Sequence, residues 1–355
     1  MTQTVTQTLK NVSSISPGPA YKSLTLTEAI DFIDRLQENV NQAAVVKPQT
    51  LKLILTTILG RGHLLLEDVP GVGKTLVAKA LARSISASFK RVQCTPDLLP
   101  SDITGASIYN QKEQRFIFVP GPLFAQFVLV DEINRATPRT QSSLLESMAE
   151  RQVTVDGQRY PLEEPFFLIA TQNPVETAGT FPLPEAQLDR FLMSLSLGYP
   201  QFEDEVLILE REEQEDPLTN LEAVLSPGDV LALQELVKNV GVVRPLKEYI
   251  VSLLTATRSH PDVLLGVSPR GGVALQRAAQ AMALLNHRNF VTPDDIKTVA
   301  KAVLGHRLIT LERSTELAHR IVDSVLNSVP VPLQPPGKVS SPTLQRLSNR
   351  LNNQS

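Results

Sequence analysis

A glycine-rich loop that carries one lysine and one threonine is the part of this sequence best suited to chemistry. The apolar run 64–66 stops at a turn rich in glycine and proline, which ends in Gly73-Lys74-Thr75 before a helix-compatible stretch. A strand, a loop and a helix in this order are the context in which a phosphate-binding loop is credible. Backbone N–H groups and the helix N-terminus would then face the phosphates. The predicted nucleotide-binding residues are Asp68, Val69, Pro70, Gly71, Val72, Gly73, Lys74, Thr75 and Leu76.

Two side chains of this loop have the types that nucleotide chemistry needs. Lys74 would reach the β- and γ-phosphates, and the Thr75 hydroxyl would ligate Mg²⁺. The general pattern G-x-x-x-x-G-K-[ST] starts with glycine, whereas this chain has Asp68 at that position. Gly71 and Gly73 still supply the backbone freedom that such a loop requires. The loop therefore predicts a nucleotide with Mg²⁺, against the alternative of a chance glycine-rich turn.

A pair of carboxylates follows a second apolar run. Residues 127–130 indicate a buried parallel strand, and Asp131 and Glu132 come directly after them. Ligands bind at the carboxyl ends of strands in open α/β sheets. Asp131 is expected to hold Mg²⁺ through its water shell, and Glu132 to polarise the attacking water. With no N-K-x-D guanine motif in the chain, this pair favours ATP hydrolysis over GTP hydrolysis and over passive nucleotide binding.

A polar amide follows a third apolar run. Residues 166–171 indicate another buried strand, and Gln172-Asn173-Pro174 follows it. Asn173 would orient the water near the γ-phosphate if this strand lies beside the one that carries Asp131. The alternative is that Asn173 only caps the turn before Pro174.

These pieces, in this order, resemble the AAA+ ATPases, and in particular the MoxR family. The resemblance spans about residues 25–330, and an aspartate at the position of Asp68 recurs in that family. It implies a two-part ATPase core, ring assembly with hexamers expected, and chaperone-like work on proteins that carry von Willebrand factor A domains. The segments that carry it are GHLLLEDVPGVGKTLVAKALA, FVLVDEINRATPRTQSSLLESMAERQVTVDG, FFLIATQNPVETAGTFPLPEAQLDRF, SPRGGVALQRAAQAMALL and VTPDDIKTVAKAVLGHR.

The resemblance also assigns two arginines. Arg190 is similar in position to the arginine finger, and Arg270 to the sensor 2 arginine. Both roles need a fixed guanidinium near the charge that develops on the γ-phosphate. The alternatives are a surface ion pair for Arg190 and a solvated helix start for Arg270. Arg135 and Arg139 are competing candidates for contacts between subunits.

The pattern and the resemblance together predict the fold class. We expect an α/β phosphate-loop AAA+ core with a parallel sheet, followed by a smaller all-helical lid domain, with the nucleotide in the crevice between them. Lid helices are expected to open at 226–229, at Arg270 and at 292–295, and the second of these is expected to turn Val273, Ala274, Ala278 and Ala281 inward. Two hairpins are expected on the core: residues 106–119, which match the helix-2 insert, and residues 153–162, a pre-sensor-1 hairpin with a type I′ turn signal. The expected divisions are a polar mobile tail at 1–22, the AAA+ core at 23–200, the helical lid at 201–330 and a second polar mobile tail at 331–355.

Composition limits the function further. Among 355 residues, 34 are Lys or Arg and 37 are Asp or Glu, and this balance argues against a dedicated nucleic-acid surface. The single cysteine, Cys94, excludes an internal disulfide and fits a reducing compartment. No apolar run approaches the length of a membrane span, and the first residues lack the pattern of a signal peptide. We therefore expect a cytoplasmic protein without a membrane span.

The leading hypothesis is a Mg²⁺-dependent ATPase that forms an oligomeric ring and remodels or activates a partner protein, such as a metalloenzyme under maturation. One alternative is a magnesium-chelatase-type ATPase subunit, which would share the same site residues. The other alternative is a nucleic-acid motor, which would need a basic pore. The only candidate tip for such a pore, residues 110–114, has one lysine and one glutamate.

Overall fold

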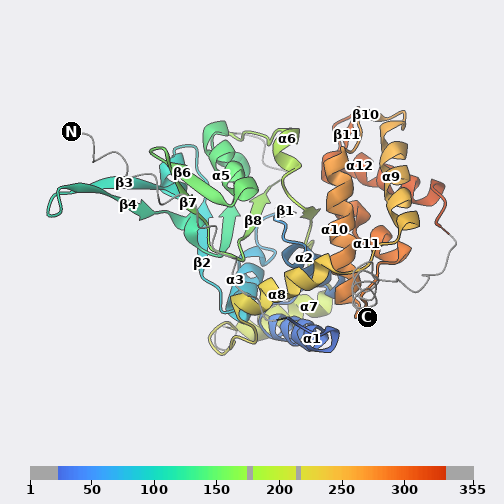
Figure 1. The fold of residues 1–355 in the computed structure, drawn as a ribbon, viewed down its shortest axis with the longest axis horizontal. Coiled ribbons are helices and arrows are strands. Elements are labelled where there is room, and N and C mark those ends of the chain that lie inside the picture. Colours follow the sequence, from blue (N-terminus) through green and yellow to red (C-terminus); the bar gives the residue numbers. More distant parts are fainter. Residues whose placement is uncertain (1–22, 174–178, 213–216, 333–355) are drawn as a thin grey trace, which may run out of the picture.

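The computed structural model describes residues 23–173, 179–212 and 217–332 of the chain. The predicted tail 1–22, and all but the first two residues of the predicted tail 331–355, lie outside these residues. An α/β core occupies one end of the molecule and a helical region the other, so the predicted fold class is confirmed (Figure 1).

A five-stranded parallel sheet of order β2-β5-β8-β1-β9 forms the centre of the core. Three strands were predicted from apolar runs, while β2 and β9 were not. Because the strands are parallel, their carboxyl ends meet at one edge, where Asp131 of β5 lies in register with Gln93 of β2. At the same edge, Glu67 of β1 is in register with Gln172 of β8. The strands are β1 (Leu64–Glu67), β2 (Phe89–Gln93), β5 (Phe127–Asp131), β8 (Phe167–Gln172) and β9 (Met193–Leu195).

Successive residues of the central strands point to opposite faces of the sheet. Leu64 and Leu66 pack with helices α1, α2 and α3 in one apolar cluster. Leu65 and Val128 belong to a second cluster, with helix α5 on the other face. The sheet is therefore buried on both sides, as parallel sheets are. These helices are α1 (Leu26–Ala43), α2 (Pro48–Leu59), α3 (Lys74–Ser84) and α5 (Pro138–Glu150).

Both predicted hairpins are present on the core. Strands β3 (Gly105–Asn110) and β4 (Arg115–Pro120) form an arm that extends away from the body (Figure 1). Strands β6 (Gln152–Val155) and β7 (Gln158–Pro161) are joined by two residues with positive φ, as a type I′ turn requires. The ring of Phe118 stacks on that of Tyr160 with 4.0 Å between centroids, so the two hairpins touch at their bases.

In the described residues after the sheet there are six longer helices, with a small antiparallel pair of strands among them. Three of the helices begin where the sequence predicts, after the N-caps Ser226, Ser268 and Thr292. One expectation is wrong: Val273 was expected inside, but it is 58% exposed because its face of α10 borders a cleft and not the lid interior. The elements are α7 (Phe202–Glu212), α8 (Pro227–Lys238), α9 (Arg244–Arg258), β10 (Val263–Leu265), α10 (Pro269–Leu285), α11 (Pro293–Leu304), β11 (Ile309–Thr310) and α12 (Thr315–Ser328). Shorter helices are α4 (Pro100–Thr104), α6 (Glu185–Leu188), η1 (Pro122–Phe124), η2 (Ile133–Arg135) and η3 (Gly305–Arg307).

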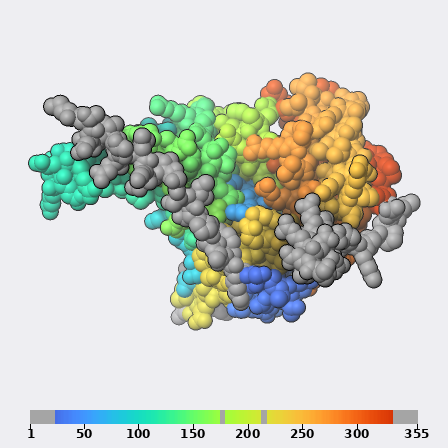
Figure 2. Space-filling model, in the orientation of Figure 1, coloured from blue at the N-terminus to red at the C-terminus, as the bar shows by residue number. Residues whose placement is uncertain are grey.

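The segment before α8 packs against the core. Arg83 Nε of α3 donates to the carbonyl of Leu221 at 2.6 Å, and Asn39 of α1 donates to the carbonyl of Glu222 at 3.0 Å. The boundary at residue 200 between core and lid therefore stays a prediction. The space-filling view shows the core and the helical region in contact along a broad front (Figure 2). In the described part of the chain, no helix combines the length and the apolar character that crossing a membrane requires.

Candidate nucleotide site

The phosphate loop joins β1 to α3 and forms one wall of a cavity of about 360 Å³. Gly71 and Gly73 have φ values of +90° and +84°, which side chains other than glycine rarely adopt. All residues around this cavity belong to the core, although the sequence suggested a crevice between core and lid. The lining residues are Pro70, Gly71, Gly73, Lys74, Thr75, Leu76, Arg91, Gln93, Asp131, Glu132, Thr171 and Asn173.

Lys74 lies at the start of α3 with its amine turned back onto the loop. Its Nζ donates to the backbone carbonyls of Asp68 at 3.0 Å and Val69 at 3.3 Å. Burial lowers the pKa of Lys74, and the negative charges of Asp68, Asp131 and Glu132 act in the opposite direction. A cation with loop carbonyls as its hydrogen-bond partners can turn to phosphate oxygens, which are stronger acceptors because they are charged.

Asp68 was predicted among the nucleotide-binding residues, but it is not one of the residues that line the cavity. It is 4% exposed. The carboxylate accepts hydrogen bonds from Ser196 Oγ at 2.7 Å and from the backbone N–H groups of Leu197 at 2.7 Å and Gly198 at 3.1 Å. Asp68 thus fastens the chain that leaves β9 to the base of the phosphate loop.

The two predicted carboxylates lie opposite the loop, and each has defined partners. Asp131 is 6% exposed; its carboxylate accepts from Thr171 Oγ1 at 3.2 Å and pairs with Arg91 Nε at 2.6 Å. Glu132 has a φ of +55°, a sparsely populated conformation for a residue with a side chain. Its Oε2 accepts from Gln93 Nε2 at 2.9 Å and pairs with Arg135 Nη1 at 3.2 Å.

The partners on β2 and β8 were missed by sequence reasoning. Arg91 and Gln93 lie on β2, which lacks the apolar run that marked the other strands. Thr171 Oγ1 donates to Asp131 and accepts from the backbone N–H of Glu132 at 2.9 Å, so it fixes both carboxylates. Asn173 lines the same cavity, while Pro174, on which its alternative role as a cap depends, lies outside the described residues.

The donor set suits Mg²⁺ better than a metal that needs an all-protein cage. Thr75 supplies a hydroxyl oxygen and Asp131 a carboxylate in one cavity. Across the described residues, no group of three His, Cys, Asp or Glu side chains could hold a metal ion. Mg²⁺ usually takes one or two carboxylates, substrate phosphates and waters, so these two residues fit it.

Arg190 and Arg270 do not line the phosphate cavity. They line a second cavity of about 230 Å³, whose walls also include Arg61, Arg151, Arg277 and Arg307. The structure therefore brings the two predicted arginines together, but apart from Lys74 and Glu132 of the same chain.

A buried arginine of the lid holds this second site in place. Arg307, 4% exposed, pairs through Nε with Asp189 Oδ1 at 2.7 Å, and Arg270 Nε lies 3.7 Å from Asp189 Oδ2. The Arg307 guanidinium also donates to the carbonyls of Phe191 at 2.5 Å and Leu192 at 3.2 Å. Burial lowers the pKa of Arg307 and the charge of Asp189 opposes that change. The residues on both sides of Arg190 are thus fixed by Arg307, which sequence reasoning did not single out.

A phosphate loop, a carboxylate pair and an amide on neighbouring parallel strands, followed by a helical lid, define an AAA+ ATPase. The sequence profile "ATPase family associated with various cellular activities (AAA)" matches residues 63–193, and the profile "AAA lid domain" matches residues 255–328. These matches and the site confirm that the chain is an ATPase of this class.

Comparison with individual relatives identifies the family within this class. The chain is 39% identical to Chaperone MoxR1 of Mycobacterium tuberculosis, over 86% of this chain and 84% of that protein. It is 52% identical to the uncharacterized protein YeaC of Bacillus subtilis, over 85% of this chain and 96% of that protein. A crystal structure from Cytophaga hutchinsonii, described as that of a candidate ATPase, superposes with a TM-score of 0.80 at 38% identity, over 86% of this chain and 97% of that one. The chain belongs to the MoxR family of AAA+ ATPases, as the sequence motifs predicted.

Proposed function

We propose that this chain is a Mg²⁺-dependent ATPase whose site is completed by a second copy, and that it uses ATP hydrolysis to remodel a client protein. The observation that carries the proposal is the separation of two half-sites. Lys74, Asp131 and Glu132 share one cavity, and Arg190 and Arg270 share another. A phosphoryl transfer site needs both sets around one γ-phosphate, and a ring brings the two faces of neighbouring copies together.

Within the first half-site the residues have separate tasks. Glu132 would take a proton from the water that attacks the γ-phosphorus, and the bond to the ADP oxygen would break, which gives ADP and phosphate. Thr75 and Asp131 would hold Mg²⁺, which neutralises phosphate charge when bound. Lys74 would hold the β- and γ-phosphates, and Asn173 would orient the water. Arg190 and Arg270 of the neighbour would stabilise the charge on the transferred group.

The arm formed by β3 and β4 supports a protein client more than a nucleic-acid one. On this arm Phe116 is 71% exposed, Ile108 57% and Tyr109 50%. These side chains form an apolar surface that the rest of the chain does not cover. At the tip of the arm, Arg115 pairs with Glu113 at 2.5 Å, so a carboxylate offsets part of the positive charge that a phosphate backbone would need. A relative named as a chaperone agrees with a protein client. By the family resemblance we propose hexamers, and a client with a von Willebrand factor A domain in the cytoplasm.

Two variants test the catalytic half-site. Lys74→Ala should abolish ATP binding because it removes the charge that holds the phosphates. Glu132→Gln should bind ATP and lose turnover by about 10²- to 10⁴-fold, the usual contribution of a general base. Tight ATP binding by Lys74→Ala, or full turnover by Glu132→Gln, contradicts the assignment.

The remodelling step has its own test. Glu132→Gln protein, held in its ATP state, should capture the client for identification by mass spectrometry. A remodeller must bind its client with different affinity in its ATP and ADP states. Equal client affinity in both states refutes remodelling, and preferential binding of single-stranded DNA would indicate the motor alternative.

A further inference from the structure

A cleft between the core and the helical region holds more positive than negative charge. Its cavity of about 540 Å³ is lined by Leu59, Gly60 and Arg61 at the end of α2, by Arg151 after α5, and by residues of α8 and α10. None of its lining residues borders the phosphate cavity. Its volume lies within the range of small-molecule sites.

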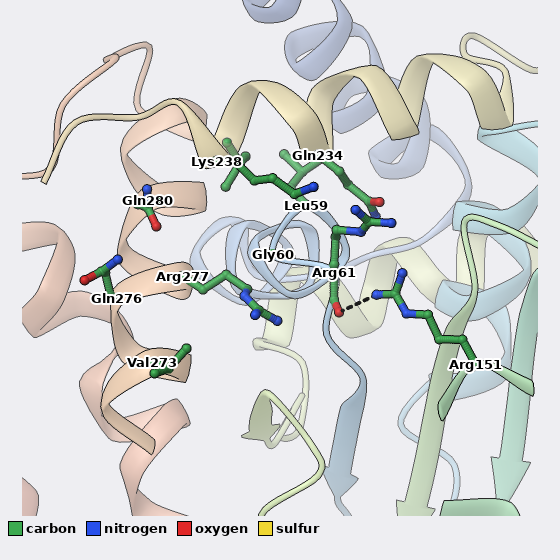
Figure 3. Close-up of a pocket in the computed structure, with 11 residues that line it drawn as sticks. Leu59, Gly60, Arg61, Arg151, Gln234, Lys238, Val273, Gln276, Arg277 and Gln280 are labelled. Carbon is green, nitrogen blue, oxygen red and sulfur yellow. Dashed lines mark hydrogen bonds between the residues drawn. The ribbon is translucent and has the colours of Figure 1, made fainter. Parts of the chain in front are cut away.

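The four cations of this cleft come from four parts of the fold: Arg61 follows α2, Arg151 follows α5, Lys238 ends α8 and Arg277 lies on α10. Figure 3 shows Arg277 extending from α10 towards the end of α2, where Gly60 and Arg61 lie, while Lys238 reaches in from α8. The stem of Arg277 passes over Gly60, where a Cβ atom would lie 3.8 Å from Arg277 Cγ. Arg151 is tied to the same place, since its Nη2 donates to the carbonyl of Arg61 at 3.3 Å.

Two carboxylates face these four cations. Glu164 pairs with Arg61 at 3.0 Å and with Arg151 at 2.6 Å. Glu235 pairs with Arg61 at 3.1 Å and with Lys238 at 2.6 Å. Both carboxylates are thus shared, and among the residues that the structure describes two positive charges of the cleft have no matching negative charge.

Arg277 is the cation without a partner. Within the described ranges it makes no hydrogen bond and no ion pair, although its side chain remains accessible from the cleft. Burial lowers its pKa, and the positive charges of Arg151 and Arg61 lower it further. Like charges this close cost stability unless an anion joins them. Planar guanidinium groups match the oxygens of phosphate, and each can donate two parallel hydrogen bonds.

We propose that this cleft is a second anion site, which binds a phosphate group, free or esterified to a small molecule, through Arg277 and the adjoining Arg61 and Arg151. A dianionic phosphate would supply the two missing negative charges. Because the cleft walls come from the core and from α8 and α10, the bound molecule would also tie these parts together.

The test uses the full-length Lys74→Ala protein, in which the phosphate loop no longer competes for the probe. Inorganic phosphate, ribose 5-phosphate and uncharged ribose are titrated by calorimetry. We expect one phosphate-bearing molecule per chain and no binding of ribose. Tighter binding of ribose 5-phosphate than of inorganic phosphate would identify an ester as the ligand, and equal binding would identify free phosphate.

Further variants in the same background locate the site. Arg277→Gln should weaken binding at least tenfold, and Arg277→Lys should weaken it less because it keeps the charge. Arg244→Gln, which removes a cation 89% exposed on α9, should leave it unchanged. The cleft adjoins the cavity of Arg190 and Arg270, because Arg61, Arg151 and Arg277 line both.

Two outcomes overturn the proposal. One is the absence of saturable phosphate binding, or binding that Arg277→Gln leaves intact. The other is a smaller oligomer in Arg277→Gln, when phosphate does not bind to the parent protein. That result would make the cleft a contact between copies. Neither outcome bears on ATP hydrolysis, because every protein in the test already lacks Lys74.

Discussion

Replacing Arg307 by methionine should loosen the lid from the segment that carries Arg190. The change removes a guanidinium that is 4% exposed. Among the described residues, it leaves Asp189, 22% exposed, with Arg270 at 3.7 Å as its remaining ion-pair partner. Removing one partner of a buried ion pair costs about 3–5 kcal/mol. Asp189 keeps some contact with water and can draw Arg270 closer, so we expect the lower end, about 3 kcal/mol. With a urea m-value of about 3 kcal/mol/M, the unfolding midpoint should fall by about 1 M.

The assay is urea unfolding followed by circular dichroism, with ATP turnover measured on the same preparations. Arg244→Met is the matched control, because Arg244 pairs with Glu248 at the surface and its side chain is 89% exposed. The control should keep the parent midpoint. In Arg307→Met, kcat should fall while ATP binding persists, since the phosphate cavity has no wall from the lid. An unchanged midpoint together with unchanged kcat would refute the inference that Arg307 positions Arg190.

Three other outcomes follow from the geometry. Asp68→Gly restores the general loop pattern, yet it should lower the free energy of unfolding by about 2 kcal/mol, because the hydrogen bonds to residues 196–198 are lost. Urea unfolding measures this change, and a more stable variant would contradict the prediction. Burial lowers the pKa of His63 from 6.5 to about 4, and the charge of Arg151 contributes to the decrease. The protein therefore has its full free energy of unfolding above pH 6.5 and loses part of it as the pH falls towards 4, about 2 kcal/mol at pH 5. His63→Gln should make the free energy of unfolding less dependent on pH in that window, and an unchanged slope would count against it. Replacing 110–114 by a shorter turn should leave ATP turnover intact and weaken client binding in a pulldown, whereas undiminished capture would exclude the arm as a contact.

The parts of the fold that the sequence predicted are those in which local pattern and burial agree. All residues of β5 are buried, and its apolar run was therefore readable. In contrast, β2 lies at the edge of the sheet with Lys90 and Arg91 exposed, so no apolar run marks it in the sequence. Because this strand was not predicted, Arg91 was not recognised as the partner of Asp131. Strand β9, with three residues, is too short to leave a pattern.

The site was predictable where its residues are neighbours in sequence and not where the fold brings them together. The loop around Lys74 is one short motif, and its identification needs no tertiary structure. Arg307 lies 118 positions from Asp189, and only the return of the lid to the core brings them into contact. The role of Asp68 depends in the same way on the chain after β9. Val273 was placed inside by helical period, which cannot distinguish the lid interior from a cleft between lid and core.

The central claim is that one copy supplies the phosphate loop and its neighbour supplies Arg190. It is tested most directly by ATP turnover in mixtures of Arg190→Ala and Lys74→Ala proteins, with co-assembly verified by native mass spectrometry. Each variant alone should be nearly inactive: the first lacks the arginine and the second the phosphate cradle. In mixed assemblies, the Lys74→Ala copies still offer Arg190 to the intact loops of the Arg190→Ala copies, so activity should return in proportion to such contacts. Co-assembled mixtures that stay as inactive as the separate variants would contradict the claim.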